Sequence, residues 1–353
     1  MVDRHWAILL LTWGLGPSSS VCLALFLVNR WLINWVDGPF KNFAIGATGF
    51  AAVGFAIWSV QSSLLTSVVL PVALLSIFAV GEAHRAYLRA SYRPRGGGGN
   101  PVGSICLLRP VTTTAVVTRH YTTIADLGVG GIRIAQLSDL HFNATLPAGY
   151  FESVFEKVRA QSPDLLVITG DFISKAEYFP VLKRLLPLLP KAPLGVHSIL
   201  GNHDHWAKLP EEICQELSRA GITPLGGRCE TIPLPGPRRL LICGTEKPWG
   251  PDALLAATEA EDYVVVLSHT PDNIYEWSER ADVMFAGHNH GGQLRIPALG
   301  ALVMPSRYGR RFDRGHFKVK RTELFVSAGI GVDRPHVRLF CPPEIVVLDI
   351  KCL

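Results

Sequence analysis

Five apolar segments of this sequence each end at side chains that can bind a metal ion. In the clearest case, Val196–Leu200 is followed by Gly201 and then by Asn202, His203 and Asp204. The other four segments end at Asp139 and His141, at Asp171, at His269, and at His288 and His290. Ligands of open α/β sheets bind beyond the carboxyl ends of the strands, so these five ends can converge. The pattern predicts an α/β domain whose strands deliver one polar site.

Segments with helical spacing alternate with these runs, as in a layered α/β fold. We expect helices over Phe151–Gln161, Glu211–Ala220, Asp252–Ala260 and Asn273–Arg280. Strand-like patterns predict one or two edge strands within Val111–Thr123 and a final strand over Glu344–Ile350.

Most of the hydrophobic excess lies before residue 82. The chain is 48% hydrophobic, and the runs Trp6–Val28, Phe43–Val60 and Leu64–Val80 approach the ~20 residues that cross a bilayer. A further apolar patch, Trp31–Val36, follows the first run. We therefore expect three or four transmembrane helices, and no cleaved signal peptide, because several runs follow one another.

The positions of Arg residues next to these runs predict an orientation. Arg85, Arg89, Arg93 and Arg95 follow the last run, and basic residues favour the cytoplasmic side. The chain is therefore predicted to be a multi-pass protein of the inner membrane with its catalytic domain in the cytoplasm. The expected divisions are an anchor region at 1–90, a linker at 91–118 that contains the Gly-rich stretch 96–101, and a domain at 119–353.

Charge and cysteine content exclude other classes of protein. A net charge of +5, without a basic tail or an arginine-rich helix, gives no indication of a nucleic-acid partner. The cysteines are odd in number, irregularly spaced and without a CxxC pair, so we expect neither a zinc knuckle nor a disulfide framework. Free or buried thiols are predicted for Cys22, Cys106, Cys214, Cys229, Cys243, Cys341 and Cys352.

The residue types at the strand ends favour particular metal ions. Asp, His and Asn without cysteine suit Mn²⁺, Fe²⁺ or Zn²⁺. Seven candidate ligands are too many for one ion and suit two, if Asp171 is shared. Two neighbouring ions can polarise a phosphoryl group and stabilise the attacking and leaving oxygens of a displacement.

The motifs also resemble a known family. Asp139-x-His141, Gly170-Asp171, Gly201-Asn202-His203-Asp204, His269 and Gly287-His288-Asn289-His290 match, in order, the five motifs of calcineurin-like metallophosphoesterases. The stretches Gly291-Gly292-Gln293 and Arg338–Ile345 resemble the bacterial membrane-associated YaeI/YkuE-type branch. This resemblance implies a four-layer αββα sandwich with a dinuclear site at the sheet edge, preceded here by the transmembrane helices.

The resemblance also implies a role for each matched residue. Asp139, His141 and His290 would bind one ion, Asn202, His269 and His288 the other, and Asp171 both. The expected cofactors are two divalent ions, with Mn²⁺ the first choice and Fe²⁺ or Zn²⁺ the alternatives. His203 would protonate the leaving oxygen, and Asp204 would orient His203. Ser174 stands where many relatives have a second Asp, a position without an assigned ligand role.

Three further residues are candidates for contacts with the substrate. His205 follows the motif directly and could touch a substrate phosphate, although adjacency to a motif is not itself a mechanism. Arg310 and Arg311 belong to the basic run Arg307–Arg314, which is either a solvated loop or a contact for phosphate or anionic lipid.

The predicted function is a membrane-anchored phosphoesterase that depends on two metal ions and cleaves a phosphate ester or pyrophosphate, with a lipid-linked substrate as one candidate. The alternatives are a general phosphodiesterase for soluble substrates and an enzyme of the lipid A pathway similar to UDP-2,3-diacylglucosamine pyrophosphatase. A non-catalytic metal-binding scaffold is disfavoured because every motif position is filled. A transporter is disfavoured because Phe43–Val80 contains no ionisable side chain.

Overall fold

The computed structural model describes residues 2–29, 39–61, 68–93, 110–234, 238–253, 262–297 and 300–352. The chain forms two compact units, one made of Met1–Ser91 with Leu302–Arg311 and the other of Tyr92–Ala301 with Phe312–Leu353. The apolar patch Trp31–Val36 and most of the predicted linker lie outside the described residues.

The first unit consists of three helices and the short segment Leu302–Arg311. The helices are α1 (Val2–Leu27), α2 (Pro39–Gln61) and α3 (Leu70–Ser91). Helix α1 packs against both others. The side-chain amide of Asn29 donates to Leu302 O (2.7 Å) and its oxygen accepts from Met304 N (2.8 Å). These bonds tie the short segment to the end of α1.

The predicted transmembrane helices are wrong for the part of the chain that the structure describes. Within those ranges no helix combines the length and the apolar character that crossing a bilayer requires. Helix α1 contains the polar stretch Ser18–Ser20, α2 is rich in Gly and Ala, and the C-terminal half of α3 carries Glu82 and Arg89. The predicted multi-pass location in the inner membrane, with a cytoplasmic catalytic domain, depended on those helices and is overturned with them.

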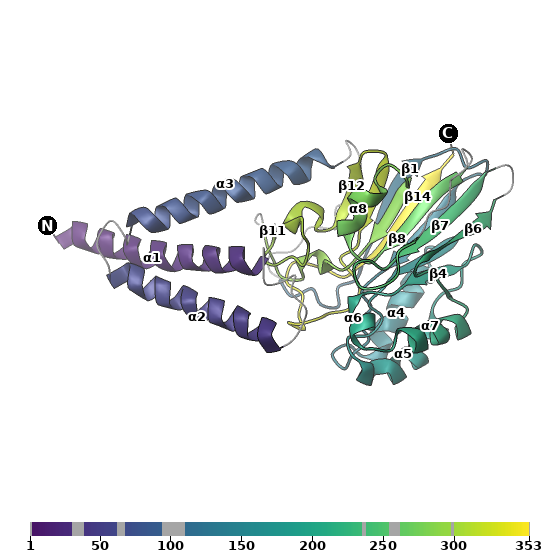
Figure 1. Cartoon of the computed structure of the whole chain (residues 1–353), viewed down its shortest axis with the longest axis horizontal. Helices are drawn as coiled ribbons and strands as arrows, with labels where there is room; N and C mark the ends of the chain where they lie inside the picture. The colour runs from purple at the N-terminus through teal and green to yellow at the C-terminus, as the bar shows by residue number, and fades with distance from the viewer. Residues whose placement is uncertain are drawn as a thin grey trace. The chain divides into compact units, whose positions relative to one another are not determined.

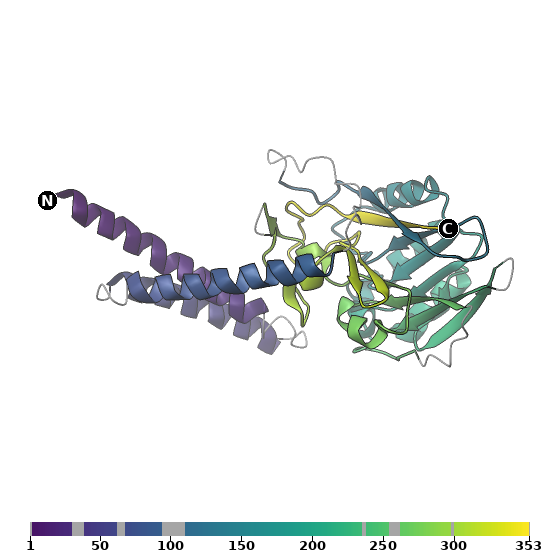
Figure 2. The same ribbon diagram turned by 90° about the horizontal axis from the view of Figure 1, so that it is seen from above.

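The second unit contains a first sheet of six strands that mixes parallel and antiparallel pairs. Its order is β1-β14-β2-β3-β4-β5. The strands are β1 (Val117–Ile124), β14 (Glu344–Lys351), β2 (Ile132–Leu137), β3 (Leu165–Thr169), β4 (Val196–Ile199) and β5 (Thr223–Pro224). The predicted edge strand is confirmed in β1, which pairs in parallel with the C-terminal strand β14. Figure 2 shows this yellow strand beside strands that come much earlier in the chain.

A second six-stranded sheet packs against the first. Its order is β12-β13-β9-β8-β7-β6. The strands are β12 (Gly315–Val319), β13 (Thr322–Val326), β9 (Val283–Ala286), β8 (Asp262–Ser268), β7 (Arg239–Thr245) and β6 (Arg228–Pro233). A separate two-stranded ribbon joins β10 (Arg295–Ile296) and β11 (Gly300–Ala301).

Helices lie between the strands in the sequence. They are α4 (Ala148–Arg159), α5 (Phe179–Leu185), α6 (Asn202–Trp206), α7 (Pro210–Arg219) and α8 (Ile274–Trp277). One-turn helices are η3 (Ala176–Tyr178), η4 (Leu186–Leu188), η5 (Pro271–Asn273), η6 (His290–Gly292) and η7 (Gly309–Phe312). Figure 1 shows α4, α5 and α7 together on one side of the first sheet. The predicted layered α/β architecture therefore corresponds to two mixed sheets with these helices.

Alternation along the strands creates two hydrophobic cores. Ile132 and Ile134 of β2 face the second sheet and join a core that includes Val265 and Phe285. Leu137, on the other face of β2, joins the core beneath α4, α5 and α7. Successive side chains of a strand point to opposite faces, so one short strand contributes to both cores. Because β2 is buried on both of its faces, its carboxyl end is held in a fixed position.

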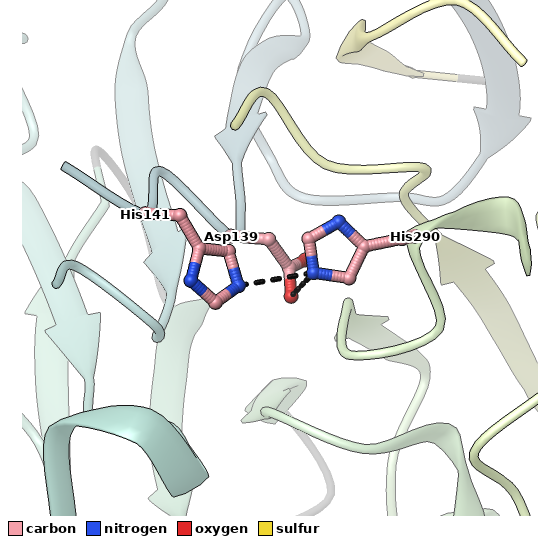
Figure 3. A group of neighbouring side chains, drawn as sticks. All are labelled: Asp139, His141 and His290. Atoms are coloured by element: carbon pink, nitrogen blue, oxygen red, sulfur yellow. Dashed lines mark hydrogen bonds and ion pairs between the residues drawn. The ribbon is translucent and has the colours of Figure 1, made fainter. Parts of the chain in front are cut away.

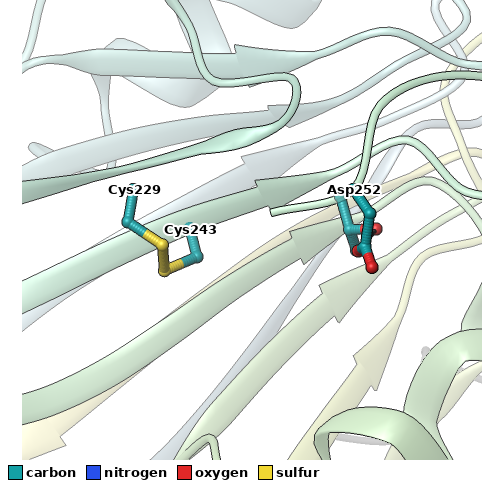
Figure 4. Close-up of a disulfide and its surroundings, with 4 residues drawn as sticks. Cys229, Cys243 and Asp252 are labelled. Atoms are coloured by element: carbon teal, nitrogen blue, oxygen red, sulfur yellow. Dashed lines mark hydrogen bonds between the residues drawn. A yellow bond between two sulfur atoms is a disulfide. The ribbon is translucent and has the colours of Figure 1, made fainter. Parts of the chain in front are cut away.

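The prediction for the cysteines was wrong for one pair. Cys229 of β6 and Cys243 of β7 form a disulfide, drawn in Figure 4. The two residues lie directly opposite each other in the antiparallel register. Their spacing in the sequence carries no signal of this pairing, which depends on the register of the hairpin. Cys106 lies outside the described residues, and Cys22, Cys214, Cys341 and Cys352 are free thiols.

Leu267→Ala should destabilise the second unit. Leu267 is fully buried between the sheets and lies two residues before His269. Loss of a buried leucine leaves a cavity and typically lowers the free energy of unfolding by about 2–5 kcal/mol. Leu188→Ala is the matched control, because Leu188 is 39% exposed and should change that free energy by about 0.5 kcal/mol or less. Urea unfolding of the full chain measures both, and equal midpoints would contradict the assigned core.

Candidate metal centre

The predicted site residues of five strand ends lie at one edge of the second unit. From the first sheet, β2 leads to Asp139 and His141, β3 to Asp171, and β4 to Asn202 at the start of α6. From the second sheet, β8 leads to His269, and β9 leads to His288 and His290. Each sheet therefore contributes part of the site, and their packing decides how closely the two parts approach.

Asp139, His141 and His290 form the first group of potential ligands. Their donor atoms all lie within 4.8 Å of one another. The Nε2 atoms of His141 and His290 are 3.0 Å apart, and His290 Nε2 is 3.5 Å from Asp139 Oδ1. Figure 3 shows the two rings with these nitrogens facing each other beside the carboxylate. Two ring nitrogens and a carboxylate oxygen in this arrangement fit a cation of the Mn²⁺ or Zn²⁺ type.

Asp171 belongs to two further groups. One joins it to His141 and His203, and the other joins it to Asp139 and His269. Its Oδ2 atom is 3.3 Å from Nε2 of both His141 and His269. Its Oδ1 atom accepts a hydrogen bond from His203 N at 2.9 Å. The carboxylate of Asp171 therefore lies between the two halves of the site.

His269 is held in the tautomer that leaves its inner nitrogen available. Its Nδ1 lies 2.7 Å from Thr169 O, and because a carbonyl only accepts hydrogen bonds, Nδ1 carries the proton. Once it has lost its proton, Nε2 would offer its lone pair to a metal ion in the site; this atom is 3.0 Å from Asn202 Oδ1 and 3.3 Å from His288 Nδ1. Metal-bound histidines commonly have this pattern of an outer N–H bonded to a carbonyl. The donor set here therefore fits a second cation.

Five of the site residues have a backbone conformation that is rare for residues other than glycine. The φ angles of Asp139, His141, Asp171, His288 and His290 are 51°, 43°, 57°, 66° and 48°. Such left-handed residues cluster where the surrounding structure imposes the conformation for function. Backbone bonds such as Asp139 N to Gly170 O (3.0 Å) and His141 N to Asp171 O (2.9 Å) hold these turns.

The buried carboxylates and imidazoles of the site shift one another's pKa values. Burial disfavours ionisation of Asp171, but the imidazoles of His269 and His203 hold its pKa well below the usual value. Burial likewise disfavours a charged His269, yet the carboxylate of Asp171 raises the pKa of His269 to about 9. Burial raises the pKa of Asp139. The buried, ionised carboxylate of Asp171 requires a positive charge beside it. Either a protonated histidine or a metal ion can supply that charge.

Asp204 contacts the backbone of neighbouring loops. Its Oδ1 accepts hydrogen bonds from Phe172 N (2.9 Å) and Ile173 N (3.2 Å), and its Oδ2 accepts one from Gly201 N (3.0 Å). Burial and the charge of Asp171 raise the pKa of Asp204 to about 7. The carboxyl group thus joins the loop after β3 to the loop after β4.

The ring of His203 lies between two other acceptors. Its Nδ1 is 3.4 Å from Ser174 O, and its Nε2 is 3.5 Å from Asp333 Oδ2. The ring also packs edge-on against His141, with centroids 4.7 Å apart. Asp333 was not among the residues predicted from the sequence, since no strand-like run leads to it.

Two residues of the branch-specific stretches support the site. The side chain of Gln293 donates to Asp333 O (2.9 Å) and accepts from Asp333 N (3.2 Å). Arg338 is fully buried, donates to Ala328 O (2.7 Å) and lies 3.2 Å from His290 Nδ1. The sequence did contain a signal for these two residues, because the stretches that contain them were singled out, although without a role.

The three predicted substrate contacts have other partners in the structure. His205 Nε2 pairs with Glu246 Oε2 at 2.9 Å. Arg310 forms an ion pair with Glu82 within the helical unit, and the guanidinium of Arg311 lies 5.6 Å from the ring centroid of Tyr308. Their contact with a substrate stays a prediction.

Comparison with known proteins identifies a family for the residues around the site. Residues 132–292 match the family described as "Calcineurin-like phosphoesterase". The chain contains a calcineurin-like metallophosphoesterase domain. The match covers all seven predicted ligands, from Asp139 to His290.

Three similar proteins extend this result for the metallophosphoesterase domain. The "Uncharacterized metallophosphoesterase YkuE" of Bacillus subtilis is 28% identical over 67% of this chain and 86% of its own length. "UDP-2,3-diacylglucosamine pyrophosphatase LpxG" of Chlamydia muridarum is 29% identical over 63% of this chain and 84% of its own. "Phosphodiesterase YaeI" of Escherichia coli is 28% identical over 66% and 87%. The family match and these named relatives support a phosphoester hydrolase.

Gly201→Ala should weaken metal binding by the metallophosphoesterase domain. A Cβ at Gly201 would collide with Asp171 Oδ1 and lie 2.7 Å from His269 Cε1. Displacement of ligand-supporting groups typically lowers metal affinity about 10–100-fold, which competition between the protein and a chelator for Mn²⁺ would measure. Gly149→Ala is the matched control, since nothing lies within 4 Å of its added Cβ. Unchanged affinity in Gly201→Ala would mean that Asp171 is not a ligand.

Proposed function

We propose that this chain hydrolyses phosphodiester or pyrophosphate bonds with the help of two divalent metal ions. Mn²⁺ is the first choice, and Fe²⁺ or Zn²⁺ are the alternatives, because the donors are His, Asp and Asn without cysteine. The main support is the convergence of the ligand groups on Asp171, whose carboxylate lies 3.3 Å from a ring nitrogen in each half of the site.

The proposed ligand sets follow the two halves of the site. The first set is Asp139, His141 and His290, the second is Asn202, His269 and His288, and Asp171 belongs to both. When bound, the ions would withdraw charge from the phosphoryl group and lower the barrier to its displacement. The protein would contribute fixed donors: Thr169 O holds the ring of His269, and Asp139 accepts a hydrogen bond from the backbone of His288 at 3.0 Å.

His203 is proposed to supply the proton that the leaving oxygen needs. Its ring is 15% exposed and adjoins His141, so it lies at the boundary between the proposed ligands and solvent. Nδ1 of His203 donates a hydrogen bond to Ser174 O, so Nε2 is the atom that would transfer the proton. Asp333, 3.5 Å from Nε2, would keep the ring in place. Asp204 would act indirectly, through the backbone of the loops that carry Asp171 and His203.

The named relatives indicate which substrates to test first. One is a phosphodiesterase, and another is a pyrophosphatase for UDP-2,3-diacylglucosamine. We therefore consider a lipid-linked nucleotide pyrophosphate the first candidate and a general phosphodiesterase of soluble substrates the alternative. A non-catalytic scaffold is the weakest alternative, because every motif position that would supply a ligand or the proton donor is filled.

A substrate panel tests the proposed activity. The full chain is stripped of metal, reloaded with Mn²⁺, Fe²⁺ or Zn²⁺, and assayed with bis(p-nitrophenyl) phosphate, p-nitrophenyl phosphate and UDP-2,3-diacylglucosamine. We expect turnover of the diester or of the pyrophosphate that is lost after chelation and restored by Mn²⁺. Hydrolysis of the monoester alone would contradict the proposed bond specificity.

Asp171→Asn and His203→Ala should separate metal binding from proton transfer. Asp171→Asn should lose both metal and activity, because an amide replaces the shared carboxylate. His203→Ala should keep its metal content and lose about 10²–10⁴-fold in kcat, the usual effect of losing a general acid. Elemental analysis and steady-state kinetics on the same samples give both values.

Asp333→Asn serves as the intermediate case. It keeps the size of the side chain, so metal content should be unchanged and kcat should fall less than in His203→Ala. If His203→Ala also lost its metal, His203 would be a ligand and not the proton donor.

A further inference from the structure

Two tryptophans adjoin opposite halves of the candidate metal centre, and no role has been assigned to either. Trp206 ends α6, and its ring centroid lies 5.0 Å from that of His203. The residue is 37% exposed. Large apolar side chains that stay partly exposed beside a reactive group commonly form part of a binding site.

Trp249 approaches the site from the other sheet. Its ring centroid is 4.9 Å from that of His288 and 5.7 Å from that of His269. The residue is half-buried and lies in the turn that follows β7. Trp206 therefore adjoins the proposed proton donor, while Trp249 adjoins two proposed ligands.

Glu246 fixes the two tryptophan-bearing segments to each other. Its buried carboxylate accepts from Leu200 N (2.8 Å) and pairs with His205 Nε2 (2.9 Å). Its backbone oxygen accepts from Trp249 N (3.0 Å) and Gly250 N (2.9 Å). His205 directly precedes Trp206, so one buried residue connects both tryptophans. The contacts of Glu246 therefore hold the segments that carry Trp206 and Trp249 in fixed positions relative to each other.

Gly250 shows how closely these segments approach. A Cβ at Gly250 would lie 2.6 Å from Glu246 Oε2 and 2.7 Å from His205 Cε1. Only glycine fits this contact without displacing the pair, so the turn that carries Trp249 packs directly on His205.

We propose that Trp206 and Trp249 form a stacking site for a planar group carried by the substituent of the phosphate that does not leave. This inference rests on the proposed function, because it places the phosphate between the two groups of ligands. Indole faces carry partial negative charge and favour offset or edge contacts with other aromatic rings, worth more than the buried area alone. Flexible alkyl chains gain no such geometric preference. The substrate class is therefore a phosphodiester with a ring system close to the phosphorus.

Three chromogenic diesters with one leaving group test this preference. They are p-nitrophenyl benzyl phosphate, p-nitrophenyl cyclohexylmethyl phosphate and p-nitrophenyl methyl phosphate. The leaving group is identical, so the rates differ only through the second substituent. With the Mn²⁺-loaded full chain we expect kcat/KM for the benzyl ester to exceed that for the cyclohexylmethyl ester about fivefold, the typical effect of one aromatic pair.

Substitutions assign the preference to each ring. Trp206→Leu and Trp249→Leu should each reduce the benzyl-to-cyclohexylmethyl ratio towards one, whereas Trp206→Phe and Trp249→Phe should retain most of it. Inhibition by benzyl phosphate, compared with cyclohexylmethyl phosphate, gives the same ratio without turnover. Metal content and the unfolding midpoint of each variant show whether it is folded and loaded.

The outcomes separate this inference from the proposed function. Hydrolysis of none of the three diesters by the wild-type chain would reject the phosphodiesterase activity itself. Equal or faster hydrolysis of the cyclohexylmethyl ester would retain that activity and reject stacking, in favour of an apolar site for alkyl chains. A ratio unchanged in both leucine variants would also reject the role of the tryptophans.

Discussion

The site depends on the buried carboxylate of Asp171 and on the positive charge that it requires. Two imidazoles contact one of its oxygens, and the backbone of His203 donates to the other. A carboxylate removed from water in this way is stable only beside a cation or strong donors. The imidazoles of His141 and His269 meet this requirement when they are protonated or bound to a cation. The carboxylate is packed so closely that Gly201, next to it, has no room for a side chain.

Local sequence patterns predicted the strands and the polar residues at their carboxyl ends, because each strand and the polar residues that follow it are adjacent in the sequence. Ile132–Leu137 and Val283–Ala286 lie in different sheets, and yet both lead into the site. What the sequence could not provide was the set of partners brought in by tertiary packing. Asp333 reaches His203 from a loop 130 positions later, and Asp204 bonds to backbone groups that no motif identifies. The disulfide depends likewise on the register of a hairpin.

In the helical unit, by contrast, the length of the apolar runs was a misleading signal. Runs of apolar residues near the length of a membrane span were counted as spans. The helices that formed include Ser18–Ser20 in α1 and Glu82 in α3, and none within the described ranges meets the requirement. An apolar run indicates a membrane span only if the helix that contains it has few polar residues along its whole length. Without that check, an apolar helix that does not cross a membrane can be mistaken for a span. The segment Leu302–Arg311, which joins this unit from far along the chain, could not have been inferred from local pattern.

The division of the proposed ligands between two sheets has a consequence for how the domain would respond to metal loss. Asp139, Asp171 and Asn202 follow strands of one sheet, while His269 and His290 follow strands of the other. Side chains such as Val265 and Phe285 hold the sheets together away from this edge. Ions held by both sheets would fasten them at the edge itself, where like-charged and strained groups otherwise meet. Depletion of the ions would then loosen this edge first, so that hydrogen exchange rises in the ligand loops while the strands remain protected.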